Sequence, residues 1–100
     1  LLFHKAYTIS PADLRKAIDE RRPTRLDYVD NDGARTERVV RPVGLFFWGN
    51  RWTLTAWCEL RDDFRDFRLD RIQGMSMLDT RFEPEPGKTI EDFFARWEEQ

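Results

Sequence analysis

The chain has 100 residues, 40% of them hydrophobic and 36% charged, with a net charge of −2, which fits one globular domain and excludes a disordered chain. It contains no apolar run of the roughly 20 residues that span a bilayer and no signal peptide, so we expect a soluble, cytoplasmic protein without membrane contact. The single cysteine, Cys58, excludes a disulfide within the chain, and the start at Leu1 leads us to expect further sequence upstream.

The first part of the chain predicts an arm and one helix. Residues 1–9 are apolar without a clear period and are expected to form an N-terminal arm or the remnant of a linker. An N-cap, a proline at the first helical position and an acid in the first turn follow: Ser10, Pro11 and Asp13. Apolar residues then repeat at helical spacing up to Pro23: Leu14, Ala17 and Ile18. We expect this helix to cover one side or one open end of a sheet.

Residues 10–82 predict a small, mainly β domain. Strand-like segments occupy residues 24–29, 35–48, 52–58, 64–72 and 75–82. Pro42 and Gly44 divide the second segment, which predicts a bent strand. Gln73 and Gly74 predict a turn before the last strand. Five short strands with strong bends favour a curled antiparallel β-barrel over a sandwich, which needs more strands.

Residues 83–100 are expected to form a proline-rich connector and a short C-terminal helix. Thr89 and the acids after it are typical of a helix start. One face of this helix then carries an apolar stripe: Phe93, Phe94 and Trp97. The stripe must pack on something, either the barrel or a second subunit.

The strand at residues 52–58 and the one after it carry the candidate binding surface. Alternation places one set of side chains in the core: Trp52, Leu54, Ala56 and Cys58. The other set faces outward: Thr53, Thr55, Trp57 and Glu59. Arg68 projects from the following strand, and Arg65 and Arg71 lie near its ends. Guanidinium groups bind phosphate and aromatic rings stack on bases, so this surface is suited to phosphates and stacked bases. The alternative is that these arginines only form surface ion pairs with neighbouring aspartates.

The sequence lacks the patterns of catalysis and metal binding. His4 is the only histidine, and neither it nor Cys58 has a partner at a metal-ligand or catalytic spacing. Zinc and nucleotide motifs are absent from the sequence. We therefore expect no enzyme activity, no metal and no cofactor.

Three features, in order, resemble the WYL domain, a ligand-sensing module of bacterial helix-turn-helix transcriptional regulators of the DeoR-like/WYL type. They are a strand with Tyr28 before a glycine turn, Arg41-Pro42 with Gly44-Leu45, and Trp52-x-Leu54 followed by FRLDRI at residues 67–72. The resemblance covers about residues 14–82 and implies an Sm-like or SH3-like five-stranded antiparallel β-barrel with flanking helices. The middle tyrosine of the family name is Thr53 here.

The resemblance also implies a function and a set of residues. It implies a ligand-sensing domain that binds nucleic acid or a nucleotide through arginines matching Arg41, Arg68 and Arg71, and that controls an upstream helix-turn-helix domain in a homodimer. Together with the strand faces, it predicts this site: Arg68, Arg71, Arg65, Arg41, Thr53 and Trp57. Two alternatives stay open, an oligomerisation module without a ligand and a sensor of small carboxylate metabolites. Salt dependence separates a nucleic-acid site from a small-anion site, because only binding through contacts to several phosphates weakens steeply with salt.

Overall fold

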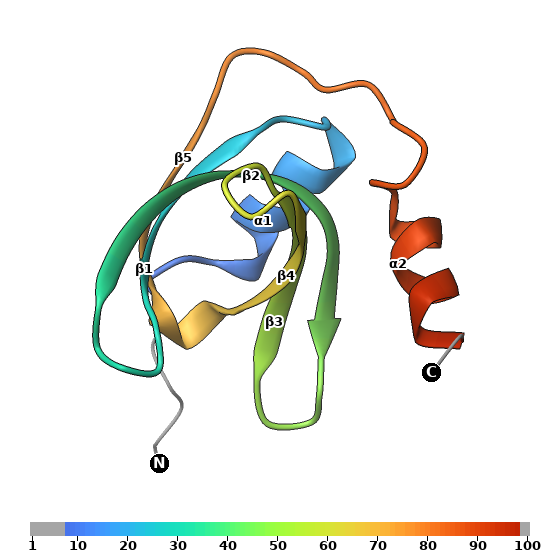
Figure 1. Ribbon diagram of the computed structural model, residues 1–100. Coiled ribbons are helices and arrows are strands. Elements are labelled where there is room, and N and C mark those ends of the chain that lie inside the picture. Colours follow the sequence, from blue (N-terminus) through green and yellow to red (C-terminus); the bar gives the residue numbers. More distant parts are fainter. Residues whose placement is uncertain (1–7, 99–100) are drawn as a thin grey trace.

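One five-stranded antiparallel sheet, with strand order β4-β3-β2-β1-β5, curls around the core of this protein (Figure 1). The computed structural model describes residues 8–98. Its elements in chain order are α1 (Pro11–Asp19), β1 (Thr24–Val29), β2 (Arg35–Phe47), β3 (Trp52–Cys58), β4 (Asp63–Arg68), the 3₁₀ helix η1 (Leu69–Arg71), β5 (Ile72–Met77) and α2 (Ile90–Glu98). The predicted class, mainly β with an N-terminal and a short C-terminal helix, is confirmed. Neither described helix is long and apolar enough to cross a membrane.

Helix α1 starts as its sequence predicts. The backbone N–H of Ala12 donates to Ser10 Oγ at 3.1 Å, which satisfies one of the free donors of the first turn. Leu14 and Ala17 are fully buried, so the apolar face of α1 closes one side of the curled sheet. The predicted arm falls largely outside the described residues, except that Ile9 is buried against the same core.

Strand β2 bends where Pro42 and Gly44 predicted it. Its pairing with β3 shifts register between these two residues, as a proline without a ladder donor requires. Gly44 is also a point of close approach, because an added Cβ would lie 2.9 Å from Ile90 Cδ1 and 2.9 Å from Phe46 Cε2. The bend thus lets the start of α2 contact the outer side of β2.

The segment after β4 differs from the prediction. Strand β4 ends at Arg68, a 3₁₀ turn follows, and β5 begins at Ile72, so the turn predicted at Gln73 and Gly74 is wrong. Leu69 and Ile72 are both buried, and a spacing of three fits one 3₁₀ turn better than a continuing strand. Strand β5 pairs with β1, with Gly74 opposite Asp27.

The predicted barrel is not closed. Within the described part of the chain, β3 is the partner of β4 and β1 is the partner of β5, so these two strands remain the edges of the sheet. They are joined at one corner by η1, which brings their ends together without a ladder between them.

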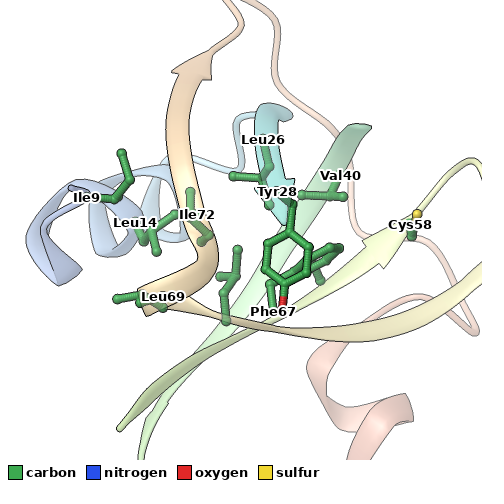
Figure 2. Close-up of a cluster of buried hydrophobic side chains, with 11 residues drawn as sticks. Ile9, Leu14, Leu26, Tyr28, Val40, Cys58, Phe67, Leu69 and Ile72 are labelled. Carbon is green, nitrogen blue, oxygen red and sulfur yellow. The ribbon is translucent and has the colours of Figure 1, made fainter. Parts of the chain in front are cut away.

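The core lies inside the curl and under α1 (Figure 2). The rings of Tyr28 and Phe67 meet edge to face with centroids 5.0 Å apart. Leu54 is fully buried as predicted and Leu69 is fully buried too, whereas Trp52, which was also predicted in the core, is only partly buried at the rim. Phe67 fills the centre of the core from β4.

Helix α2 lies against the outer side of the sheet, away from α1 (Figure 1). Thr89 and Asp92 cap it reciprocally: the N–H of Asp92 donates to Thr89 Oγ1 and the N–H of Thr89 donates to Asp92 Oδ2, each at 3.1 Å. Its stripe packs on rings of the sheet: Phe94 on Phe46, Trp97 on Trp48, and Phe93 on Phe64.

Candidate functional site

A polar cavity of about 340 Å³ opens between the β4 edge, η1 and the β1–β2 turn. Four arginines line it: Arg61, Arg65, Arg68 and Arg71. Tyr28 and the polar turn residues Asp30, Asn31 and Asp32 complete its walls, together with Asp66. Three of the six predicted site residues therefore meet at one place, and we call this place the arginine cavity.

Arg65 is the side chain at the centre of this arrangement. It lies opposite Ala56 in the β3–β4 ladder and so turns toward the core side of the sheet. Its guanidinium carbon lies 5.4 Å from the Tyr28 ring centroid and 5.1 Å from that of Phe67. Its Nη1 is buried and, within the described residues, has no hydrogen-bond acceptor. A buried donor without an acceptor costs free energy unless a ligand or water binds it.

Two further arginines raise the positive charge around Arg65. Burial, followed by the charges of Arg38 and Arg61, lowers the pKa of the Arg65 guanidinium below its ordinary value. Arg38 is 8% exposed; its Nε donates to Thr36 Oγ1 at 3.2 Å and its Nη1 lies 3.8 Å from Cys58 Sγ. Within the described residues none of these three guanidinium groups has a carboxylate within 4 Å.

Arg68 and Arg71 border the cavity with partners of their own. Arg68 forms a fork with Asp70, with Nε–Oδ1 at 3.0 Å and Nη2–Oδ2 at 2.6 Å. Its backbone N–H donates to the Tyr28 hydroxyl at 3.1 Å, and Arg71 donates to the side chain of Asn31. These contacts hold both arginines in position at the rim of the cavity.

The structure does not bring Arg41 into the arginine cavity. Arg41 Nε lies 2.7 Å from Glu59 and its Nη1 2.8 Å from Glu85, and its guanidinium stacks on Phe82. The hydrogen bond from Arg41, and then that from Lys88, lowers the pKa of Glu85. Arg41 thus lines a separate, mostly apolar cavity of about 160 Å³ beside Pro42, where it ties the connector to the sheet.

Thr53 and Trp57 are buried rather than outward-facing, with 9% and 8% of their surfaces exposed. Thr53 Oγ1 accepts a hydrogen bond from Trp48 Nε1 at 2.8 Å. The Trp57 ring is covered by Phe64, 5.2 Å away between centroids, and by the Lys88 ammonium at 5.1 Å. Neither residue lines the arginine cavity. The face expected to bind ligand is covered by α2 and the β2–β3 tip, because their aromatic rings need a surface to pack on.

Sequence reasoning missed Arg38 and Arg61. The signal for Arg38 was present, because it shares a strand face with Val40, which is fully buried, and alternation therefore sends both side chains inward. Arg61 stands in a polar turn, where no periodicity marks the direction of a side chain.

Comparisons with known proteins show which family this domain resembles. The model of the WYL domain family matches residues 11–77. The DNA-binding transcriptional repressor CapW of Stenotrophomonas maltophilia is 39% identical over 62 residues, which cover 61% of this chain and 21% of that protein. The uncharacterized HTH-type transcriptional regulator YobV of Bacillus subtilis is 32% identical over 66 residues, or 66% of this chain and 21% of that protein.

A solved structure agrees with these sequence matches. Proteasome accessory factor B/C (PafBC) of Arthrobacter aurescens superimposes with a TM-score of 0.67 and 28% identity, over 79% of this chain and 13% of that one. The chain spans about a fifth of the length of CapW and of YobV, 21% in each case. The family match covers most of the chain, including every strand of the sheet. This chain belongs to the WYL domain family.

Proposed function

We propose that the arginine cavity binds an anion, a single-stranded nucleic acid or a nucleotide-like phosphate, and that this domain is the non-catalytic sensor of a bacterial transcriptional regulator. One observation carries the proposal: among the described residues, the guanidinium groups of Arg65, Arg38 and Arg61 influence one another and have no carboxylate within 4 Å, although three aspartates stand in the walls of the cavity. Proteins neutralise grouped guanidinium charges with acids unless another anion does so. Phosphate suits these planar forks, which can donate two hydrogen bonds at once.

The shape of the cavity favours one phosphate with its sugar or base over a long strand held along its whole length. A volume of about 340 Å³ lies at the lower end of the range for small-ligand pockets. Tyr28 is 3% exposed, so it supports Arg65 and offers no open face for a base. An oligonucleotide would place one phosphate beside Arg65 and pass across Arg68 and Arg71 at the rim.

The relatives support a regulatory setting. CapW is named as a DNA-binding transcriptional repressor and YobV as an HTH-type regulator. We infer that in this protein, too, an upstream helix-turn-helix domain reads DNA and that occupancy of the arginine cavity changes its activity. The regulator would act as a homodimer.

The test is fluorescence anisotropy of a labelled single-stranded oligonucleotide at low and high salt, with the Arg65→Met variant. Arg15→Gln is the matched control, because it also removes one positive charge, from an exposed arginine of α1 whose ion pair among the described residues is with Asp19. We expect binding at low salt that Arg15→Gln keeps and Arg65→Met weakens at least about tenfold, the loss expected for a charged hydrogen bond. Contact with three phosphates gives a slope of log K against log salt of about −2.

A small-carboxylate sensor is the second candidate, favoured by the small size of the cavity. In that case the slope of log K against log salt should lie between zero and about −1. Citrate or a dicarboxylate should compete with the labelled oligonucleotide as well as phosphate does. If neither oligonucleotide nor small anion binds at low salt, the sensor proposal is wrong and the oligomerisation module remains.

A further inference from the structure

The two edges of the sheet differ in how much of their backbone is already bonded. On β4, the N–H of Phe64 donates to Asp63 Oδ1 at 2.8 Å and the N–H of Arg68 donates to the Tyr28 hydroxyl. Asp63 in turn binds Arg96 of α2 at 2.5 Å. The β4 edge also carries four charged residues among six, which keeps other strands away. This edge is therefore protected.

The β5 edge has the opposite character. The N–H of Leu78 donates to the carbonyl of Pro23 at 2.8 Å, so Leu78 points toward β1. Because N–H groups alternate along a strand, Ser76 and Gly74 also point toward β1, while Met75 and Met77 turn their N–H and C=O groups to the other side. Within residues 8–98, no side chain and no loop bonds to these outward groups.

The side chains of β5 do not protect this edge either. The strand reads IQGMSM, with no charge and no proline. It lies on the opposite side of the molecule from α2 (Figure 1), so the C-terminal helix does not cover it. An uncharged edge with free backbone groups is suited to pair with another strand.

Charges stand only at the two ends of this edge, and they have opposite signs. Arg71 precedes the strand and Asp79 follows it. Asp79 is fully exposed, and among the described residues its one ion pair is a long contact of 3.4 Å to Arg22. In an antiparallel pairing of two copies centred on Met75, the register sets Arg71 of each copy, at the end of η1 and in contact with Asn31, opposite Asp79 of the other copy. The outward groups of Met75 in both copies then face each other, as a hydrogen-bonded antiparallel pair requires.

We propose that two copies of this domain join through their β5 edges, antiparallel and across a two-fold axis at Met75. The self-complementary charges favour a second copy over an unrelated peptide, because a two-fold axis satisfies both ends at once. This interface does not require the arginine cavity to bind anything. Arg71 nevertheless belongs to both places, so a ligand in the cavity would sit next to the dimer contact.

Sedimentation velocity over a dilution series tests the proposal with three variants of the 100-residue chain. Met75→Pro removes one outward N–H and none of the N–H groups that bond to β1, although it also removes a side chain that packs against the core. Asp79→Arg puts like charges together at both ends, and Arg71→Asp with Asp79→Arg exchanges them. Glu83→Arg is the control, an equal charge change at an exposed connector residue beside Arg41.

The wild type and Glu83→Arg should form a dimer, Met75→Pro should be monomeric, and Asp79→Arg should weaken the dimer about tenfold. The double exchange should restore it. If circular dichroism shows that Met75→Pro has lost strand structure, the proposal is tested by the charge variants alone, Asp79→Arg and the double variant Arg71→Asp with Asp79→Arg. The proposal is wrong if the wild type is monomeric at its highest soluble concentration. It is also wrong if the dimer forms but is insensitive to Asp79→Arg. Assembly into open chains or rings through β4–β5 pairing would overturn it as well.

Discussion

Arg65 and Arg41 show two different uses of an arginine in one small domain. Arg41 lies between two carboxylates, at 2.7 and 2.8 Å, and links the connector to the sheet. Arg65 has rings below it and positive charges beside it, and its pKa is lowered by burial and by Arg38 and Arg61. The first arrangement stabilises the fold, whereas the second leaves free energy to be gained by binding an anion.

This contrast predicts that Arg65→Met and Arg41→Met differ in their effect on stability. Arg65→Met loses its contacts with the Tyr28 and Phe67 rings but relieves charge repulsion, so the free energy of unfolding should change by no more than about 1 kcal/mol. Arg41→Met should clearly lower it, because two ion pairs are lost. Urea denaturation followed by tryptophan fluorescence measures both. A larger loss for Arg65→Met than for Arg41→Met would contradict a binding role for Arg65.

The arginines that line the arginine cavity, and Arg38 beside it, could be predicted from sequence only in part. Arg65, Arg68 and Arg71 follow one another on a strand and its end, so their grouping is local and was expected. Arg38 comes from β2 and Arg61 from a turn, and their approach depends on how strongly the sheet curls, which alternation does not reveal. Arg41 lies apart because it stands opposite Trp57 in the β2–β3 ladder, on the other face of β2 from the buried Val40, and there it meets Glu85 of the connector.

At the scale of elements, the bend of β2 decides where α2 can lie. We predict that Gly44→Ala destabilises the fold by about 1–2 kcal/mol, because its Cβ would lie 2.9 Å from both Ile90 and Phe46. Gly74→Ala is the matched control on a strand, since its Cβ would meet no atom nearer than 4.0 Å. Urea denaturation of both variants measures the difference. Equal stabilities would show that the start of α2 does not press on Gly44.

Two carboxyl groups, Asp63 and Glu85, hold α2 and its connector to the sheet, and a third, Asp92, caps α2, so the docking of this helix is sensitive to acid. Hydrogen bonds lower the pKa of Asp92, chiefly from Thr89, that of Asp63, chiefly from Arg96, and that of Glu85, chiefly from Arg41. A lowered folded-state pKa means that the charged carboxyl stabilises the fold above the ordinary values of 3.8 and 4.5. That contribution is lost as the pH falls through the folded-state pKa.

We therefore predict that α2 leaves the sheet below about pH 4, before the core opens. The Trp48–Trp97 contact reports this step by fluorescence, while circular dichroism follows the strands. Asp92→Asn keeps an oxygen that can accept from Thr89 but no longer titrates, so its fluorescence change with pH should be smaller. Asp13→Asn in α1 is the control. Simultaneous loss of both signals in the wild type would refute a separate undocking step.

The elements themselves were largely readable from the sequence, and the failures have physical causes. The capped helices, the bend at Pro42 and the strand at residues 52–58 follow from local rules and are present. The start of β5 was missed because the buried spacing of Leu69 and Ile72 fits a 3₁₀ turn as well as a strand end. Closure of the barrel depends on twist accumulated over five strands, which no local pattern fixes.

The whole molecule offers the last prediction, because a ligand that binds only the folded state must stabilise it. The anion proposed for the arginine cavity, at ten times its dissociation constant, should add about 1.4 kcal/mol to the free energy of unfolding. For a domain of this size, that raises the melting temperature by roughly 6–11 °C. Inorganic phosphate and a short oligonucleotide are the probes, and thermal unfolding followed by circular dichroism is the measurement.

The variants make this prediction specific to the site. Arg65→Met should abolish the rise in melting temperature, and Arg15→Gln should keep it. The rise should shrink with added sodium chloride, since released counterions oppose binding. A rise of the same size in wild type and Arg65→Met would mean that the anion acts elsewhere, for example on the exposed arginines of β1 and β2, whose side chains are 46% exposed for Arg25 and 66% for Arg35. Only a rise that depends on Arg65 assigns the stabilisation to an anion in the arginine cavity rather than elsewhere on the folded domain.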